Sequence, residues 1–235
     1  MSTLSILIPI FNEARTVEAL GKGLTALPPD LIHEVVVVDD GSSDGSAIRL
    51  NEILVVGGIR CKLVRKENGG KGTAIIAGIP ECTGTHMVIF DADLELDVSD
   101  LVELFQPVVD RKADVVFGIR KFSSQSSFTY RYVMGNKFLS HYFGLLFNRY
   151  LSDIMCGGKL LPVALWRDLN LKLHGFTTEA EIAAKVWSAG YVPWEVTIGY
   201  SPRTREEGKG ITVLDAVKII LLLVTLRMRL RRRQR

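Results

Sequence analysis

The sequence contains few cysteines and few histidines, and these shortages exclude two classes of protein. Its 235 residues include three cysteines, Cys61, Cys82 and Cys156, which are odd in number and widely spaced. That pattern argues against a disulfide-stabilised scaffold and is typical of a reducing compartment. The four histidines lie far apart and no CxxC pair is present, so the sequence offers no typical zinc site.

Long hydrophobic runs are also lacking. The longest charge-free apolar stretch near the C-terminus, Ile219–Leu226, would reach about 12 Å as a helix, whereas the hydrocarbon core of a bilayer measures about 30 Å. The apolar run from Leu4 to Phe11 has no basic residue before it and is followed by Glu13, which is unlike a signal peptide. We therefore expect neither a transmembrane helix nor a secretion signal.

Positive charge is scarce outside the C-terminus. The net charge is +3, but residues 227–235 contain six arginines and no acid, so the remaining chain carries −3. A nucleic-acid-binding domain would spread its basic residues over one face, and we expect no nucleic-acid partner. The tail instead predicts a local anchor for an anionic partner. Hydrophobic residues at 47% and charged residues at 23% predict a folded domain.

In the first half of the chain, short apolar runs alternate with longer helical patterns. Strands are expected at Leu4–Ile10, Glu34–Val38, Cys61–Arg65, Met87–Phe90 and Asp114–Ile119. Helices are expected at Glu13–Leu27, Asp44–Val55, Lys71–Ile79 and Val98–Asp110. This alternation predicts an α/β fold with a mostly parallel, Rossmann-like sheet. Because the strands are continuously apolar, helices should cover both faces of the sheet.

The second half is less regular. We expect a helix over Tyr132–Phe147, a loop around Asp153–Gly158 and a helix over Thr178–Ala189 that ends at a glycine. A strand should follow at Val192–Ile198, and then a polar, charged loop at Pro202–Gly210. No internal repeat or linker divides this part of the chain.

Polar residues follow each of the first four strands, where ligands bind in sheets of this kind. The carboxyl ends of parallel strands meet at one edge, so these four segments should form one rim. They read P-I-F-N-E (Pro9–Glu13), D-D-G-S-S-D-G-S (Asp39–Ser46), E-N-G-G-K-G-T (Glu67–Thr73) and D-A-D-L-E (Asp91–Glu95).

The D-A-D segment is the strongest chemical signal. Asp91 and Asp93 follow a buried strand, where two carboxylates can converge on one hard cation, and Glu95 could add a third ligand. Oxygen ligands select Mg²⁺ or Mn²⁺, and such a cation would neutralise a diphosphate leaving group. The alternative interpretation is that D-x-D only caps the following helix.

Two other rim segments have functional and structural interpretations. Asp39 and Asp40 could accept hydrogen bonds from a base or a ribose, but D-D-G-S is also good turn chemistry. Lys71 could meet an anion at a helix N-terminus, or it could be an exposed loop lysine. Because Gly72 follows Lys71, the segment is not a Walker phosphate loop, and it also lacks the dinucleotide fingerprint.

Taken together, these motifs resemble the family-2 glycosyltransferases with the GT-A fold, and among them the dolichol- and polyprenyl-phosphate hexosyltransferases such as dolichol-phosphate mannose synthase. The likeness covers roughly residues 4–215. Its first half rests on S-I-L-I-P-I-F-N-E, V-V-V-V-D-D-G-S-S-D-G, E-N-G-G-K-G and F-D-A-D-L in that order. Its second half rests on S-D-I-M-C-G-G-K (152–159), E-A-E-I-A-A-K (179–185) and P-R-T-R-E-E-G-K (202–209). Glu95 stands where many relatives have glutamine, and C-G-G-K replaces a more usual run.

The resemblance implies a role for each group of residues. Nucleotide contacts would come from Pro9, Phe11, Glu13, Asp39, Asp40, Lys71, Asp91 and Ala92. The metal would be held by Asp91, Asp93 and Glu95. The phosphates of donor and acceptor would face Arg120, Arg131, Arg205 and Lys209. The residues assigned to catalysis are Asp91, Asp93, Asp153, Arg205 and Lys209.

The reaction implied is transfer of a hexose from a nucleotide sugar, GDP-mannose or a UDP-hexose, to a polyprenyl or dolichyl phosphate. The ionised acceptor phosphate would attack the anomeric carbon while Mg²⁺ or Mn²⁺ stabilises the nucleoside diphosphate, and one displacement inverts the configuration. Three alternatives stay open: a soluble or protein acceptor, nucleotidyl transfer, and a non-catalytic, membrane-recruited module that binds a nucleotide sugar.

The C-terminal residues predict membrane association. We expect a glycosyltransferase domain over 1–210 and an amphipathic, basic helix over 211–235, whose polar stripe includes Thr212, Asp215 and Lys218. Such a helix can lie in the plane of an anionic membrane, which implies a cytoplasmic protein that is peripheral on the cytoplasmic face. The alternative is a helix packed on its own domain or on a second subunit, as in a homo-oligomer.

Overall fold

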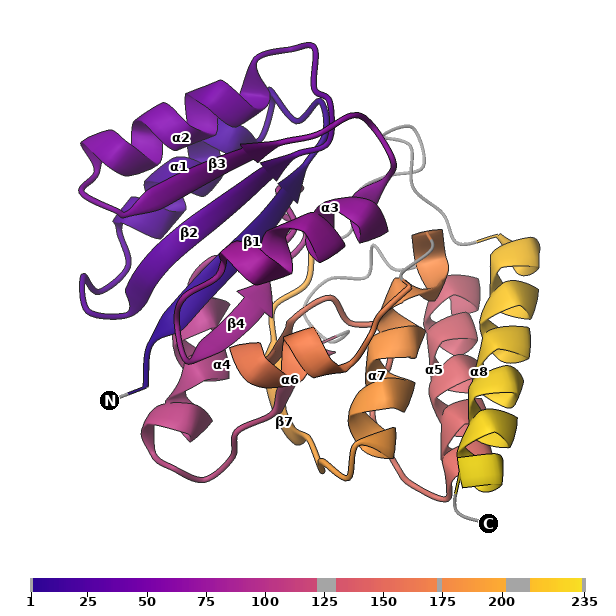
Figure 1. The fold of residues 1–235 in the computed structure, drawn as a ribbon. Coiled ribbons are helices and arrows are strands. Elements are labelled where there is room, and N and C mark those ends of the chain that lie inside the picture. Colours follow the sequence, from indigo (N-terminus) through magenta and orange to yellow (C-terminus); the bar gives the residue numbers. More distant parts are fainter. Residues whose placement is uncertain (1, 122–129, 173–174, 202–211, 234–235) are drawn as a thin grey trace.

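The computed structural model describes residues 2–121, 130–172, 175–201 and 212–233, and Figure 1 shows their arrangement. Seven strands form one sheet in the order β3-β2-β1-β4-β6-β5-β7. All pairs are parallel except those that β6 makes with β4 and β5. The strands are β1 (Leu4–Ile10), β2 (Ile32–Asp39), β3 (Cys61–Arg65), β4 (His86–Ile89), β5 (Val116–Arg120), β6 (Lys159–Pro162) and β7 (Trp194–Ile198).

Helices cover both faces of the sheet, as the continuously apolar strands predict. In β2, Val35 and Val37 pack into one hydrophobic cluster, whereas Val36 and Val38 pack into the other. The first cluster is covered by α1 (Val17–Thr25), α2 (Ser46–Val56) and α4 (Asp100–Val109). The second is covered by α3 (Lys71–Gly78), α5 (Tyr130–Phe147), α6 (Val163–Asp168), α7 (Thr178–Ser188) and α8 (Val213–Arg233). Two short 3₁₀ segments lie at Ile79–Glu81 and Gly175–Thr177.

The main departure from the predicted elements is the segment that follows residue 158. The sequence pattern predicts only a loop near here, but the structure adds the antiparallel strand β6 and the short helix α6. Lys159 begins β6 and is fully buried, which its residue type does not predict. Trp166 of α6 fixes this segment by donating its indole N–H to the carbonyl oxygen of Met87, at 2.9 Å.

Helix α8 packs against the body of the protein. Figure 1 shows it beside α5, and it contacts both α5 and α7. Ile219 and Leu223, one helical turn apart, are both 0% exposed and belong to the hydrophobic core. Arg227 lies with its guanidinium carbon 5.8 Å from the ring centroid of Phe147. The described part of the C-terminal segment therefore shares a core with residues 130–188.

Candidate active site

The candidate site lies where the strand order of the sheet reverses. From β1 the chain proceeds outward to β2 and β3, and then returns to place β4 on the other side of β1. Ligands in open α/β sheets bind at this point, beyond the carboxyl ends of the strands. The loop that follows β1 and the D-A-D segment that follows β4 therefore flank the same position of the rim.

The loops after β1 and β2 are joined by hydrogen bonds. Asn12, with a left-handed φ of 54°, accepts a bond from the amide N–H of Ser43 at 2.9 Å. Ser42 Oγ in turn accepts a bond from the amide of Asn12 at 3.1 Å. Pro9 is buried in β1, but Phe11 is 47% exposed. A large exposed aromatic ring on a rigid loop is suited to stacking against a planar ligand group.

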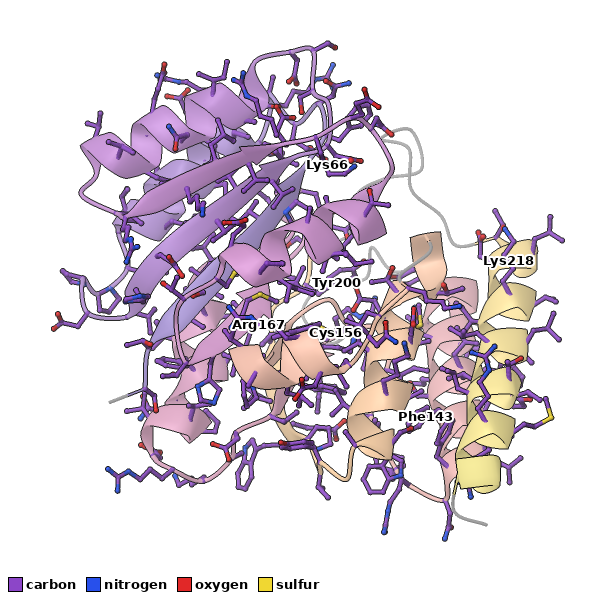
Figure 2. All side chains as sticks on the ribbon, in the orientation of Figure 1. Lys66, Phe143, Cys156, Arg167, Tyr200 and Lys218 are labelled. Carbon is purple, nitrogen blue, oxygen red and sulfur yellow. The ribbon has the colours of Figure 1, made fainter. Side chains whose placement is uncertain are left out.

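Asp39 and Asp40 are buried, so they do not form a solvated turn. Asp39 accepts a bond from the amide of Ser42 at 2.8 Å and thereby closes the turn after β2. Asp40 accepts bonds from the amides of Gly69 at 3.0 Å and Gly70 at 2.6 Å, and it also pairs with the ammonium group of Lys66 (Figure 2). The two carboxylates hold the loops after β2 and β3 in place.

Asp91, the first carboxylate of the D-A-D segment, is paired with Lys71. Its Oδ2 lies 2.7 Å from the ammonium nitrogen of Lys71, and its side chain is 25% exposed. Asp93 accepts a bond from the amide of Glu95 at 3.1 Å. Leu94, which lies between Asp93 and Glu95, adopts a φ of 59°. This conformation is strained for a leucine, and such strain is found at functional sites.

Glu95 points toward a different part of the site. It is 7% exposed and accepts a bond from the hydroxyl group of Tyr200 at 3.2 Å. Within the described residues, no three Asp, Glu, His or Cys side chains lie close enough together to hold a metal ion by themselves. The structure therefore does not group Asp91, Asp93 and Glu95 as three ligands of one ion.

Arg120 and Asp153 form a buried pair that the sequence pattern does not reveal. Arg120 Nε lies 2.6 Å from Asp153 Oδ2, and its Nη2 lies 2.8 Å from Asp153 Oδ1, which is the strong bidentate geometry. The two side chains are 6% and 3% exposed. Burial lowers the pKa of Arg120, but the bonds to Asp153 outweigh it and raise the pKa well above its ordinary value.

Two tyrosines connect this pair to Glu95. Arg120 Nη1 donates to the hydroxyl of Tyr132 at 2.8 Å, and that hydroxyl lies 2.8 Å from the hydroxyl of Tyr200. Since Tyr200 also contacts Glu95, a continuous network links three predicted site residues: Asp153, assigned to catalysis, Arg120, assigned to phosphate binding, and Glu95, assigned to metal binding. Neither tyrosine belongs to the predicted site.

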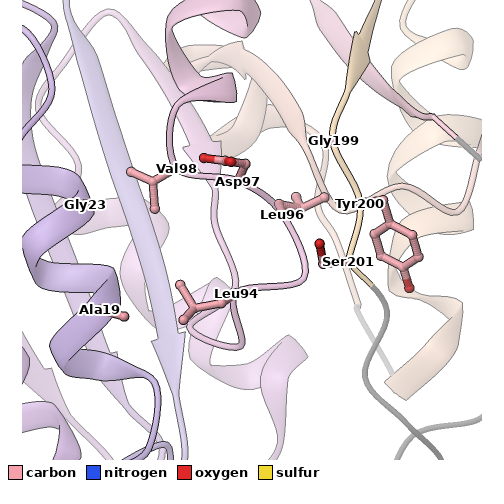
Figure 3. A pocket seen from close by; sticks show the side chains of 9 residues that line it. All are labelled: Ala19, Gly23, Leu94, Leu96, Asp97, Val98, Gly199, Tyr200 and Ser201. Atoms are coloured by element: carbon pink, nitrogen blue, oxygen red, sulfur yellow. The ribbon is translucent and has the colours of Figure 1, made fainter. Parts of the chain in front are cut away.

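A cavity of about 410 Å³ opens beside Tyr200. Figure 3 shows it between α1 and the segment that follows the D-A-D motif. Its lining is mostly apolar or backbone, and Asp97 is its charged side chain. The complete lining is Ala19, Gly23, Leu94, Leu96, Asp97, Val98, Gly199, Tyr200 and Ser201. The cavity is separate from the contact between Lys71 and Asp91.

Three of the predicted phosphate-binding residues cannot be placed around this site. Arg205 and Lys209 lie outside the described residues, and the same holds for the side chain of Arg131. Glu179 and Lys159, by contrast, are functional candidates that the predictions left out. Glu179 contacts both Lys159 and Lys71, and the spacing of these residues in the sequence gives no signal of this.

Helices α5 and α8 expose an apolar surface away from the rim. On α8, Leu214 is 72% and Leu221 is 60% exposed, and on α5 Leu145 is 81% exposed. A second cavity, of about 220 Å³, joins the two helices and is lined by Leu145, Leu146, Val224, Arg227 and Met228. Across the described part of the chain, no helix is long and apolar enough to span a bilayer.

Solved structures show the same fold. Glucosyl-3-phosphoglycerate synthase from Mycobacterium tuberculosis, in complex with Mn²⁺, uridine diphosphate and phosphoglyceric acid, superposes with a TM-score of 0.70 at 19% identity. The match covers 96% of this chain and 78% of that one. A crystal form of the same enzyme with Mg²⁺ and uridine diphosphate gives a TM-score of 0.66 at 19% identity, over 96% and 79% of the two chains. These likenesses confirm the predicted GT-A fold.

Similar sequences include proteins named for polyprenyl-phosphate substrates. Dodecaprenyl-phosphate galacturonate synthase of Rhizobium johnstonii is 26% identical over 81% of this chain and 55% of its own length. Undecaprenyl-phosphate 4-deoxy-4-formamido-L-arabinose transferase of Pseudomonas fluorescens is 31% identical over 53% of this chain and 37% of its own. The chain thus spans about half or less of the length of these relatives.

A shorter relative matches along most of its length. An uncharacterized protein of Methanocaldococcus jannaschii is 27% identical over 78% of this chain and 82% of its own length. Residues 5–161, which include β1, β2, the D-A-D segment and the Arg120–Asp153 pair, match the family described as "Glycosyl transferase family 2". Since this match covers well over half of the chain, the protein belongs to glycosyl transferase family 2.

Proposed function

We propose that the protein transfers a hexose from a nucleotide sugar to a polyprenyl or dolichyl phosphate with inversion of configuration. The observation that carries this proposal is the D-A-D segment at the switch point of a GT-A sheet in a family-2 chain. The names of the similar sequences support the polyprenyl-phosphate acceptor. The identity of the sugar is left to experiment.

The rim has the side chains to bind a divalent cation that is coordinated jointly by the protein and by the phosphates of the substrate. Mg²⁺ in proteins is commonly held by one or two carboxylates together with substrate phosphates, and Asp91 and Asp93 supply two carboxylates on one short loop. When bound, Mg²⁺ or Mn²⁺ would neutralise the charge that develops on the departing nucleoside diphosphate. Glu95 would act through Tyr200 rather than as a direct ligand, given its burial and hydrogen bond.

The residues of the chain would place the two substrates for one displacement. Phe11 and Glu13 would contact the base and ribose of the donor, next to the loops held by Asp39 and Asp40. The acceptor phosphate is ionised at neutral pH, so its oxygen can attack the anomeric carbon without a strong general base. Arg205 and Lys209, in the polar sequence that follows β7, would reduce the repulsion between the two anionic substrates.

The buried pair gives Asp153 and Arg120 a different role from direct substrate contact. Their charges are satisfied by each other, so we propose that they keep β5 and the loop before β6 in the arrangement that the acceptor requires. Asp153 also accepts a bond from the amide of Met155 at 3.1 Å. This bond fixes the start of residues 152–158, which we call the acceptor-side loop.

We further propose that the enzyme acts as a peripheral protein on the cytoplasmic face of a membrane. Helix α8 buries one apolar face in the protein and exposes a second one, at Leu214, Val217 and Leu221. Arg227, Arg229 and the arginines that follow them along the chain give the end of this helix a positive charge. An apolar helix face with adjoining arginines is suited to an anionic leaflet.

The reaction is tested by incubating the protein with a panel of GDP- and UDP-sugars and polyprenyl phosphate, with and without Mg²⁺ or Mn²⁺. We expect one lipid-linked product that disappears in EDTA. Asp93→Asn, which keeps an oxygen for the amide of Glu95, should lower the rate at least about 100-fold. If transfer occurs only to a soluble phosphorylated acceptor, the proposed lipid acceptor is wrong. If activity is complete in EDTA, the proposed metal dependence is wrong.

The polar loop is tested in the same assay. Arg205→Ala and Lys209→Ala should abolish transfer while the melting temperature stays that of the unchanged protein. If both variants keep normal turnover and normal affinity for the lipid phosphate, the loop has no part in the reaction.

A further inference from the structure

Four charged side chains form a chain of contacts next to the D-A-D segment. Asp91 Oδ2 lies 2.7 Å from the ammonium nitrogen of Lys71, which lies 3.4 Å from Glu179 Oε1. The other oxygen of the same carboxylate, Glu179 Oε2, lies 3.0 Å from the ammonium nitrogen of Lys159. Glu179 therefore uses one oxygen for each lysine, and two carboxylates alternate with two ammonium groups.

Glu179 has little freedom to move. Its carboxylate is 12% exposed, and it belongs to the first turn of α7, where the helix dipole favours a negative charge. Lys159 is 0% exposed and also donates to the carbonyl oxygen of Ile154 at 3.1 Å and to that of Cys156. The acceptor-side loop and α7 thus hold Glu179 from two directions.

Gly157 brings the acceptor-side loop into direct proximity with this cluster. A Cβ atom added at Gly157 would lie 3.3 Å from Asp91 Oδ2 and 4.0 Å from Glu179 Oε1. The loop backbone therefore passes beside the carboxylate that is expected to bind the cation. The Lys71 ammonium group contacts both of these carboxylates.

Lys71 keeps its positive charge in this position. Its ammonium group contacts two carboxylates, Asp91 at 2.7 Å and Glu179 at 3.4 Å, and a lysine paired in this way is charged at neutral pH. A divalent cation that binds Asp91 through Oδ2 must therefore displace the charged lysine from that oxygen. The lysine needs another carboxylate if this displacement is not to leave it unpaired in a half-buried site.

We propose that Glu179 is a positioning residue. It retains the ammonium group of Lys71 when a divalent cation displaces that group from Asp91. The proposal rests on the metal-dependent transfer proposed above and adds a residue to it. Glu179 keeps the ammonium group of Lys71 near the rim. The ammonium group pairs with Asp91 when no cation is bound, and it stays paired with Glu179 when a cation binds Asp91. Lys159 keeps Glu179 in place and links this exchange to the acceptor-side loop.

The test measures binding of Mn²⁺ alone to the full-length protein, by the loss of the electron paramagnetic resonance signal of free Mn²⁺. Four variants are compared: Glu179→Gln, Lys71→Met, both changes together, and Glu181→Gln. Glu181→Gln is the matched control because this substitution removes the same charge from the same helix. Glu181 pairs with Lys185 at 2.7 Å. Melting temperatures show that each variant is folded.

Glu179→Gln should weaken Mn²⁺ binding at least about threefold, because Lys71 then has Asp91 as its remaining partner in this cluster and competes more strongly. Lys71→Met should strengthen binding, because the competing ammonium group is gone. In the Lys71→Met background, Glu179→Gln should have no further effect. Glu181→Gln should bind Mn²⁺ like the unchanged protein.

The alternatives give different results. If Glu179→Gln weakens binding equally with and without Lys71, its charge acts directly on the cation and the retention of Lys71 is wrong. If Glu179→Gln has no effect on a protein that binds Mn²⁺, the inference fails while the proposed function stands. If the unchanged protein binds no Mn²⁺ in the absence of nucleotide, the inference fails, whereas the metal dependence of transfer is decided separately by the assay with EDTA.

Discussion

Several charged side chains that are buried near the rim are paired with opposite charges, and such pairs are costly to break. Arg120 and Asp153 are almost fully enclosed and share two hydrogen bonds. Removing one charge of a buried pair leaves the other without a partner in a region of low polarity. The cost of breaking this pair can be measured as a loss in the free energy of unfolding, separately from any effect on the rate of transfer.

We expect Asp153→Asn to lower the free energy of unfolding by about 3 kcal/mol, because Arg120 stays charged and buried. The asparagine retains an oxygen for the amide of Met155, so the loss reports the charge. Combining it with Arg120→Met should recover part of the stability. Urea denaturation at pH 7 measures all three proteins, and an unchanged midpoint for Asp153→Asn would contradict a buried ion pair.

Asp100 gives the protein a pH-dependent stability. Burial raises its pKa to about 6 from an ordinary 3.8, although it accepts a bond from the amide of Gly199 at 2.9 Å. Since the folded state holds this proton more tightly than the unfolded chain, the contribution of Asp100 to stability falls as pH rises from about 4 to about 6. Above pH 6 the full cost of burying the charge remains.

Asp100→Asn should remove this dependence while keeping an oxygen for Gly199. The gain in the free energy of unfolding relative to the unchanged protein should increase between pH 4 and pH 6 and then stay constant. Urea denaturation at pH 4.5 and pH 7.5 measures it. An equal difference at both pH values would show that Asp100 has an ordinary pKa.

The sequence reveals individual site residues less well than it reveals the rim to which they belong. The position of Asp91 and Asp93 at the rim could be predicted because both follow one strand, and that of Lys71 because it follows a glycine-rich turn. The pairing of Arg120 with Asp153 joins residues 33 positions apart. No local pattern specifies such a partner, and the pairing changes the role expected of both side chains.

At the scale of elements, the parallel strands were predictable and β6 was not. Val35–Val38 are buried on both faces of the sheet, and continuous apolar runs of this kind predict buried strands. Strand β6 has four residues, begins with Lys159 and ends with Pro162. A lysine and a proline are unusual in a central strand. Carbonyl groups, Glu179 and the ring of Phe117 surround the ammonium group of Lys159 and explain its burial.

Helix α8 is an element with two apolar faces, and the two faces should differ in their contribution to stability. Leu223 is 0% exposed in the core, whereas Leu221 is 60% exposed. Leu223→Ala should lower the free energy of unfolding by about 2–5 kcal/mol. Leu221→Ala makes the same change of residue in the same helix and should have an effect within about 0.5 kcal/mol.

Thermal and urea denaturation of these two variants test whether α8 is part of the folded domain in solution. Equal, small effects would mean that α8 does not pack on α5 and α7. The sequence pattern left open whether this helix serves a membrane or packs on its own domain. The packing of α8 on α5 and α7, together with its exposed apolar side chains, is compatible with both roles.

At the scale of the whole molecule, one hydrophobic core connects α5 and α8 with an element of the rim. The core beneath α5, α7 and α8 is continuous with the core beneath α3, whose first residue is Lys71. A membrane bound by the exposed face would therefore be held in a fixed relation to the rim. A lipid-linked acceptor could then enter from the surface that binds the protein.

The arginines at the end of α8 should control binding to anionic membranes without taking part in the reaction. Deleting residues 229–235 removes five arginines but leaves Arg227, which packs over Phe147. Each arginine near an anionic surface contributes about 1 kcal/mol, so the truncated protein should sediment far less with vesicles that contain phosphatidylglycerol. High salt should reproduce this loss with the full chain, because it screens the same charges.

The control is transfer to a short, water-soluble prenyl phosphate, which needs no membrane and should proceed at the same rate in the truncated and full-length proteins. Leu221→Glu, which changes the exposed apolar face of α8 and leaves its core residues intact, should also reduce sedimentation. If both proteins bind anionic vesicles as well as the full chain does, the membrane assignment is wrong. The exposed face of α5 and α8 would then be better explained as an interface with a second copy of the chain, which its molecular mass in solution would reveal.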